Sequence, residues 1–215
     1  FNIKIKGFYN TREADMAIER GIFGNDTNFE DRFIQDHKNL VKLVEHWKGI
    51  GLKIVLTSGT YDMFHIGHAK YLEKAKQLGD ILVVGVDSDE KVRARKGPNR
   101  PVVPEDERLH ILSHVRHVDV LVLKNHTDPK HNLIKLIRPD VLIVSETTGH
   151  KKNDLNVMKK FCGRIEILES QSQASTTAKI RRLHVDGMKS AIENITGEIT
   201  AVLKKAFDDI QKGGE

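Results

Sequence analysis

The fold is decided by Lys53-Ile-Val-Leu-Thr-Ser-Gly-Thr-Tyr-Asp-Met-Phe-His-Ile-Gly-His68, a stretch that changes character twice within 16 residues. It begins with an apolar, β-branched run, which is typical of a strand buried on both faces. A loop containing Gly59 follows, and a helix is expected to begin near Gly67. A strand, a turn and a helix in direct succession indicate the first unit of an α/β domain.

The same alternation continues from Lys53 to Leu183. We expect five strands, at Lys53–Thr57, Ile81–Val86, Val120–Leu123, Val141–Val144 and Ile165–Leu168. Amphipathic stretches between them predict helices at His68–Leu78, Glu105–Val115, Pro129–Ile137 and Asp154–Phe161. Strands that alternate with helices predict an α/β fold with a doubly wound, five-stranded parallel sheet. Ligands of such sheets bind beyond the carboxyl ends of the strands.

Both flanks of this domain carry apolar residues at helical spacing. Near the beginning they are Phe29, Phe33, Leu40, Val44 and Trp47, with Thr27 or Asn28 as the expected N-cap. Near the end, steps of four and three residues separate Met188, Ile192, Ile195, Ile199, Val202 and Ala206. That period is the seam of a coiled coil and predicts a homodimer contact; the alternative is a helix packed on its own domain. The expected division is therefore an N-terminal helical extension (1–50), a central domain (51–185) and a C-terminal amphipathic helix (186–215).

The amino-acid composition limits the classes of protein and of ligand that need to be considered. The 215 residues, 39% hydrophobic and 30% charged, suit a globular domain with one buried core. The single cysteine, Cys162, excludes an internal disulfide and a cysteine zinc cluster. No apolar run approaches the roughly 20 residues of a membrane span. A net charge of +5 suits anionic ligands, and the low aromatic content of 6% makes nucleic acid the weaker candidate. We therefore expect a cytoplasmic protein with neither membrane nor nucleic acid as partner.

The densest chemical signal is the pair His65 and His68. Three residues apart, they can share one side of the first helical turn. The N-terminus of a helix favours phosphate, and Gly67 between the histidines lets a phosphate approach the backbone. Two alternatives are zinc ligation, for which no neighbouring Cys, Asp or Glu cluster completes a set, and incidental surface histidines.

Two further motifs point to phosphate. Ser175-Thr-Thr-Ala-Lys-Ile180 places hydroxyls at an expected helix start, where they can cap the helix or donate to an anion. After the second strand, which we expect to continue into Asp87-Ser-Asp89, Arg93, Arg95, Lys96 and Arg100 form a basic loop. A mobile loop of this kind can close over a triphosphate; the alternative is a solvated run of charge.

These motifs resemble a known family. Gly59-Thr-Tyr-Asp-Met-Phe-His-Ile-Gly-His68 is similar to the signature of the nucleotidylyltransferase superfamily, whose fold is Rossmann-like, and Ser-Thr-Thr is similar to its second motif. Members include glycerol-3-phosphate and phosphoethanolamine cytidylyltransferases, archaeal FAD synthetase and the adenylyltransferase of ADP-heptose synthesis. Class I aminoacyl-tRNA synthetases share His-Ile-Gly-His but carry a lysine-rich second signature that is not found here. The resemblance covers Lys53 to Leu183.

The resemblance implies an enzyme that transfers a nucleoside monophosphate from a nucleoside triphosphate to a phosphorylated acceptor and releases pyrophosphate. The implied catalytic residues are His65, His68 and Lys96. Those implied for the nucleotide are Ser58, Gly59, Thr60, Gly67, Arg108, Ser175, Thr176 and Thr177. Substrate contacts are expected at Asp62, Asp87, Asp89 and Arg100, although Asp62 is better suited to orient the loop because a carboxylate repels triphosphate. Mg²⁺ is the expected cofactor, held by phosphates and water without protein metal ligands.

The sequence indicates the nucleotide base and the acceptor substrate less directly than it indicates the type of reaction. Lys96-Gly-Pro-Asn-Arg-Pro-Val-Val-Pro-Glu-Asp-Glu-Arg108 most resembles the ADP-heptose enzymes and favours ATP with a sugar phosphate. Alternatives are CTP with glycerol 3-phosphate or a related alcohol phosphate, adenylylation of FMN, and a non-catalytic nucleotide-binding regulatory module. Two stretches depart from the family pattern: 144–150 lacks the Gly-Asp element of many relatives, and 169–174 lacks the arginine that relatives binding cytidine often place before Ser-Thr-Thr.

Overall fold

The computed structural model describes residues 29–146, 152–169 and 176–212. The chain forms two compact units, one up to residue 172 and one from residue 173 onward. The first contains a five-stranded parallel sheet in the order β3-β2-β1-β4-β5. The strands are β1 (Ile54–Gly59), β2 (Ile81–Asp87), β3 (Val120–Lys124), β4 (Val141–Ser145) and β5 (Arg164–Leu168). This arrangement confirms the predicted α/β class.

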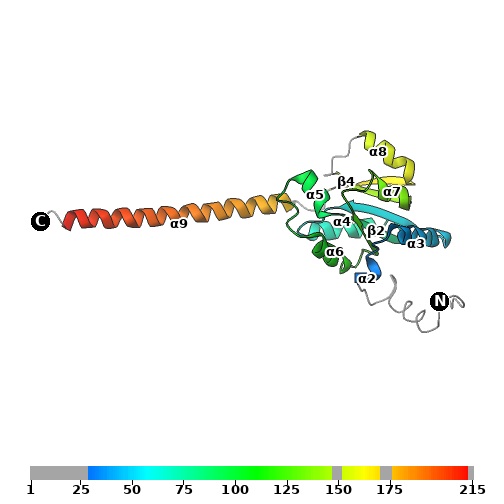
Figure 1. Ribbon diagram of the computed structural model, residues 1–215, viewed down its shortest axis with the longest axis horizontal. Coiled ribbons are helices and arrows are strands. Elements are labelled where there is room, and N and C mark those ends of the chain that lie inside the picture. Colours follow the sequence, from blue (N-terminus) through cyan, green and yellow to red (C-terminus); the bar gives the residue numbers. More distant parts are fainter. Residues whose placement is uncertain (1–28, 147–151, 170–175, 213–215) are drawn as a thin grey trace, which may run out of the picture. The chain divides into compact units, whose positions relative to one another are not determined.

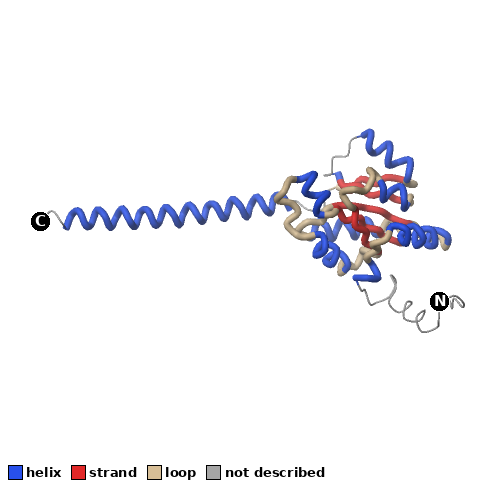
Figure 2. Tube along the Cα trace, viewed as in Figure 1, coloured by secondary structure: helices blue, strands red, loops and turns tan. Residues whose placement is uncertain are grey.

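Helices cover both faces of the sheet (Figures 1 and 2). On one face, α3 (His37–Gly49), α7 (Asn132–Ile137) and α8 (Lys152–Met158) contribute the buried side chains of Leu40, Val44, Trp47, Leu133, Ile137 and Met158. On the other, α4 (Ile66–Lys76) and α6 (Glu105–Ser113) contribute Leu72, Ala75, Leu109 and Leu112. Alternate residues of β1, β2, β3 and β4 enter the two cores, so these strands are largely apolar, as their sequences predicted. The edge strand β5 also carries Arg164 and Glu166 and is partly exposed.

The switch point of the sheet lies at β1. This strand pairs with β2 along its whole length, from Ile54 to Gly59, but with β4 only at Val55 and Leu56. Beyond Leu56 the pairing with β4 ends, and Thr57 Oγ1 donates a 3.3 Å hydrogen bond to the Ile143 carbonyl of β4. The carboxyl end of β1 is therefore open on one side, which is where ligands of doubly wound sheets bind.

One helix was not predicted. The segment expected to be a mobile basic loop begins with α5 (Asp89–Lys96), which carries Arg93, Arg95 and Lys96. Ser88 caps it by accepting from the Lys91 amide, acidic residues occupy its first turn, and Gly97 ends it at φ +95°. Strand β2 accordingly ends at Asp87 instead of continuing to Asp89. Because only one buried residue lies on α5, it has no apolar stripe by which the sequence could reveal it.

The N-terminal apolar residues belong to two helices. α2 (Phe29–Arg32) and α3 are separated by a short extended segment in which Phe33 bridges to Leu121 of β3. The side chain of Asp36 caps α3 at the Lys38 amide, 2.8 Å away. The caps expected at Thr27 or Asn28 lie outside the described residues. The described part of the extension, residues 29–50, therefore packs on the sheet as part of the core of this domain.

Other helix boundaries shift by a few residues. α6 begins at Glu105 as predicted, with Pro104 as its N-cap, whereas α7 begins at Asn132, three residues after the predicted start at Pro129. A short 3₁₀ turn, η2 (Lys159–Phe161), follows α8 where one continuous helix was expected.

The second unit is a single helix, α9 (Thr176–Lys212). It begins at the Ser-Thr-Thr motif, where a helix was expected to open, and continues without interruption through the predicted C-terminal helix. None of the helices in the described ranges is long and apolar enough to cross a membrane.

Candidate active site

The two histidines of the motif lie together at the N-terminus of α4. His65 is the N-cap, and its Nδ1 accepts a hydrogen bond from the Gly67 amide at 3.1 Å. The rings of His65 and His68 stack with centroids 3.9 Å apart and planes 22° from parallel. Because Nδ1 of His65 accepts, the neutral ring carries its proton on Nε2, a donor suited to a phosphate oxygen. The structure thus brings together the pair that the sequence singled out.

Aromatic side chains hold His68 in place. Tyr61 meets its ring edge-on at 5.5 Å, and Phe64 lies against it at 5.6 Å. Tyr61 is itself buried and, like Met63, has a positive φ, 53° and 48° respectively. Non-glycine residues rarely adopt this conformation, and such backbone is concentrated at functional sites. The loop between β1 and α4 is therefore shaped to fix the position of the imidazoles.

Asp62 organises the loop that follows α5. Its buried carboxylate accepts hydrogen bonds from the amides of Val102 and Val103 at 3.0–3.2 Å. It also forms an ion pair with Arg100, 3.3 Å away. These contacts match the orienting role that the sequence favoured over direct substrate contact. They tie the histidine loop to the basic segment.

Arg108 connects three loops from inside the protein. Its side chain is fully buried, and its guanidinium donates to the carbonyls of Thr60, Asp87 and Val103. A fourth bond reaches the carboxylate of Asp89 at 2.7 Å. A guanidinium has five N–H donors, so most of its capacity is used within the protein. Arg108 thereby fixes the ends of β1 and β2 relative to α6. Its contact with the nucleotide stays a prediction.

Asp87 is the centre of a charged cluster at the carboxyl end of β2. Arg95 binds it at 2.9 Å and Lys124 at 3.1 Å, while Arg95 also donates to Thr60 Oγ1 at 2.8 Å. Burial alone would raise the pKa of Asp87, but the two cations outweigh burial and hold the pKa below its usual value. Asp87 therefore stays ionised and anchors cations at the mouth of the site.

Lys96 lies in a strongly cationic neighbourhood. Partial desolvation, then repulsion from Arg95 and Arg100, lower the pKa of its ammonium group, and Asp62 and Asp87 offset only part of this effect. The charged form of Lys96 is thus less stable in the free protein than that of a lysine in water. A bound anion would reverse that balance, so this group of cations is suited to receive phosphate.

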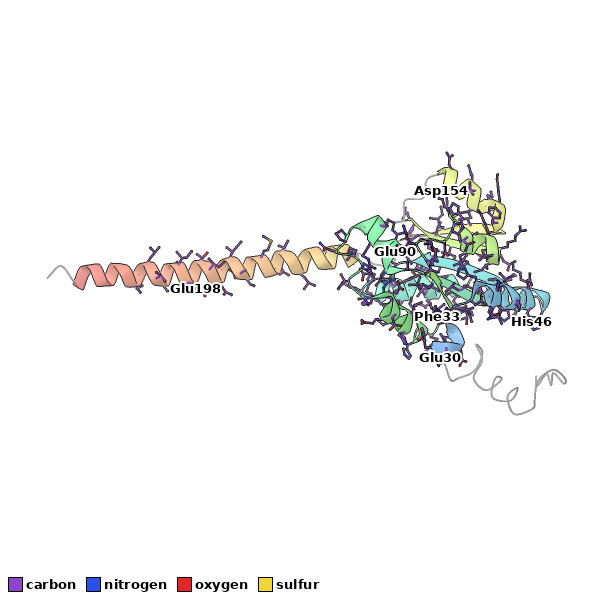
Figure 3. All side chains as sticks on the ribbon, in the orientation of Figure 1. Glu30, Phe33, His46, Glu90, Asp154 and Glu198 are labelled. Atoms are coloured by element: carbon purple, nitrogen blue, oxygen red, sulfur yellow. The ribbon has the colours of Figure 1, made fainter. Side chains whose placement is uncertain are left out.

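The remaining predicted residues fall into two groups. Ser58, Gly59 and Thr60 lie at the carboxyl end of β1, and buried Gly67 lies in the first turn of α4. Ser175 lies outside the described residues, and only the backbone of Thr176 and Thr177, at the start of α9, is described. Figure 3 shows that Glu90, on α5, and His46, on α3, lie at opposite ends of the sheet domain. The described candidates gather at the α5 end.

Two cations in this cluster were missed or underrated by sequence reasoning. Lys124 is the last residue of β3 and meets Asp87 because the parallel register pairs the two residues. Arg95 was counted only as part of a basic loop. Both are recoverable from sequence in principle, since the carboxyl ends of neighbouring parallel strands share one edge.

No group of three or more His, Cys, Asp or Glu side chains within the described ranges is arranged to hold a metal ion. Near the histidines, Asp62, Asp87 and Asp89 are each engaged by arginine or lysine. The donors that remain suit phosphate oxygens better than a metal cage.

The fold and the histidine motif together define a nucleotidyltransferase domain. The chain belongs to the cytidylyltransferase-like family, whose model matches residues 56–183.

Among curated proteins, the chain is similar to the bifunctional protein HldE of several bacteria. The protein of Syntrophotalea carbinolica is 36% identical over 154 residues, which are 71% of this chain and 31% of that protein. The protein of Geobacter metallireducens is 36% identical over 178 residues, which are 82% of this chain and 36% of that protein. The protein of Helicobacter pylori is 39% identical over 147 residues, which are 68% of this chain and 32% of that protein. The chain thus spans about a third of the length of these relatives.

Among solved structures, a lipopolysaccharide core biosynthesis protein from Thermoplasma volcanium is 28% identical, with a TM-score of 0.47. The match covers 58% of this chain and 100% of that chain.

Proposed function

We propose that this protein catalyses adenylyl transfer from ATP to a sugar phosphate with release of pyrophosphate. The observation that carries the proposal is the stacked pair His65 and His68 at the N-terminus of α4, beside a cluster of cations. ATP and a sugar phosphate are favoured by the similarity of the Lys96 to Arg108 segment to the ADP-heptose adenylyltransferases.

The reaction is a single in-line displacement. An oxygen of the acceptor phosphate attacks the α-phosphorus of the nucleotide, the bond from that phosphorus to the bridging oxygen breaks, and pyrophosphate leaves. A phosphate monoester is an adequate nucleophile, so no covalent enzyme intermediate is needed. The protein therefore contributes position and charge stabilisation.

The histidines stabilise the charge that develops during the displacement. Nε2–H of His65 donates to the α-phosphate, and His68 donates to the bridging oxygen that becomes part of pyrophosphate. The positive end of the α4 helix dipole adds favourable potential at the same point. Tyr61 and Phe64 keep the His68 ring in place.

The cations bind the rest of the triphosphate. Lys96 and Arg95 offset the β- and γ-phosphate charge, and the Asp62 contacts hold Arg100 and the adjoining backbone beside them. Mg²⁺ bound by phosphates and water would offset further charge, and the phosphate-binding donors of the site fit this arrangement. Thr176, at the start of α9, is proposed as a further phosphate contact.

The test is pyrophosphate release. The protein is incubated with ATP or CTP, Mg²⁺ and one acceptor from a panel of sugar phosphates, glycerol 3-phosphate and FMN, with acceptor-free reactions as controls. We expect release that requires both ATP and a sugar phosphate. Release with CTP and glycerol 3-phosphate, or with FMN, would replace the substrate assignment. Nucleotide binding by calorimetry without release from any acceptor would favour a regulatory module instead.

Lys96 makes nucleotide affinity dependent on pH. Only its protonated form attracts phosphate, and its pKa lies below the ordinary 10.5 in the free protein. We expect ATP affinity to fall as pH rises through that lowered pKa, with proton uptake on binding at pH values near it. Lys96→Gln should weaken binding about 10- to 100-fold at neutral pH, as expected for loss of a charge-assisted hydrogen bond. It should also remove this pH dependence.

Isothermal titration calorimetry in two buffers of different ionisation enthalpy measures both the ATP affinity and the number of protons taken up on binding. Lys42→Gln, a change of the same kind at an exposed position on α3, is the matched control. This variant should bind ATP like the unaltered protein. Equal affinity of Lys96→Gln and the control would remove Lys96 from the site.

A further inference from the structure

Helix α9 carries an exposed apolar face. Val185, Met188, Ile192, Ile195, Ile199 and Val202 are each between 55% and 67% exposed. Side chains of this size are normally buried, and a contiguous exposed set marks an interaction surface.

The spacing of this face selects a helical partner. Val185 extends the sequence-derived seam by one position, so that apolar residues follow steps of three and four from Val185 to Ala206 without a break. This is about three heptads, the length at which the period becomes a dependable coiled-coil signal. Val185, Ile192 and Ile199 occupy position a, where β-branched residues are favoured. A period of 3.5 keeps the seam facing a neighbouring helix along its length, which a flat surface does not require.

Charge argues against other occupants. From Val185 to Lys204 the helix carries three acidic and two basic residues, Asp186, Glu193, Glu198, Lys189 and Lys204. Helices that lie on anionic membranes have a polar face rich in lysine and arginine, and nucleic-acid binding also needs a basic surface. A nearly neutral helix can instead approach an identical copy without strong repulsion. Figure 3 shows the described side chains, including Glu198, distributed along α9.

We propose that α9 docks on the same helix of a second copy of this chain, forming a coiled coil along the seam from Val185 to Val202. A homodimer is the smallest such assembly. The inference does not rest on the proposed chemistry, because the seam residues lie in a unit separate from the one that carries the histidines.

The test compares Ile195→Asp with Ser190→Asp. Ile195 is at the centre of the seam, whereas Ser190 is exposed at heptad position f, opposite it. Mass is measured by light scattering across a protein dilution series, and pyrophosphate release per chain confirms that the sheet domain is intact. We expect the unaltered protein and Ser190→Asp to have the mass of two or more chains, and Ile195→Asp to be a monomer with unchanged release.

Three outcomes would overturn the proposal. A monomeric unaltered protein would do so directly, and a monomer that floats with phosphatidylcholine vesicles would identify lipid as the occupant. An assembly that Ile195→Asp leaves intact would place the contact on another surface. Loss of pyrophosphate release in every protein with assembly preserved would count against the chemistry alone.

Discussion

His68→Ala should lower turnover about 10²- to 10³-fold, the usual cost of removing one donor from a site that stabilises developing charge. His68 acts on the leaving oxygen, whose charge grows only in the transition state. The loss should therefore fall on kcat, with a smaller change in KM. Steady-state pyrophosphate release with the acceptor identified by the panel measures both constants.

The matched control is His46→Ala, an exposed histidine at the opposite end of the sheet domain (Figure 3). It should keep full turnover. His68→Asn is a second variant, which fills more of the space between Tyr61 and Phe64 and separates lost packing from lost chemistry. Near-normal turnover in both His68 variants would exclude the imidazole from the reaction.

Arg108→Met should destabilise the sheet domain by about 3 kcal/mol, because removing one partner of a buried ion pair leaves the others uncompensated. Methionine retains the length of the side chain but none of the bonds to Thr60, Asp87, Val103 and Asp89. For a chain of this size the loss corresponds to a fall in melting temperature of roughly 6–12 °C. Thermal unfolding followed by circular dichroism measures it.

Arg116→Met, at an exposed position, is the control and should unfold like the unaltered protein. The experiment also separates two roles for Arg108. If Arg108→Met unfolded normally but bound ATP far more weakly, the residue would contact the nucleotide as its sequence motif suggested. A purely structural role for Arg108 would then be wrong.

The sequence predicted the sheet because four of its five strands, β1 to β4, are apolar and largely buried. An apolar, β-branched run is recognisable without knowledge of its neighbours, and all five strands were placed within two residues of their ends. Helix α5 was missed because it is almost wholly exposed, although Ser88, its acidic first turn and Gly97 are readable boundary signals. Local periodicity thus predicts buried elements better than exposed ones.

The residues of the site also differ in how well the sequence predicts their contacts. His65 and His68 are adjacent in one helical turn, so their spacing alone predicts that they meet. The partners of Arg108 and Asp87 are 5 to 48 residues away, and they come together through strand register and loop packing. From sequence alone, an arginine within a phosphate-binding motif is therefore predicted to contact the ligand. The structure is needed to show that its side chain is buried and bonded within the protein.

The most direct test of the central claim is a crystal structure of the protein with Mg²⁺ and a non-hydrolysable analogue of ATP, α,β-methylene-ATP. We predict that the α-phosphate lies over the N-terminus of α4, with an oxygen about 3 Å from Nε2 of His65 and the bridging group beside His68. A nucleotide bound elsewhere on the domain, with both imidazoles out of contact with phosphate, would contradict the role assigned to the two histidines.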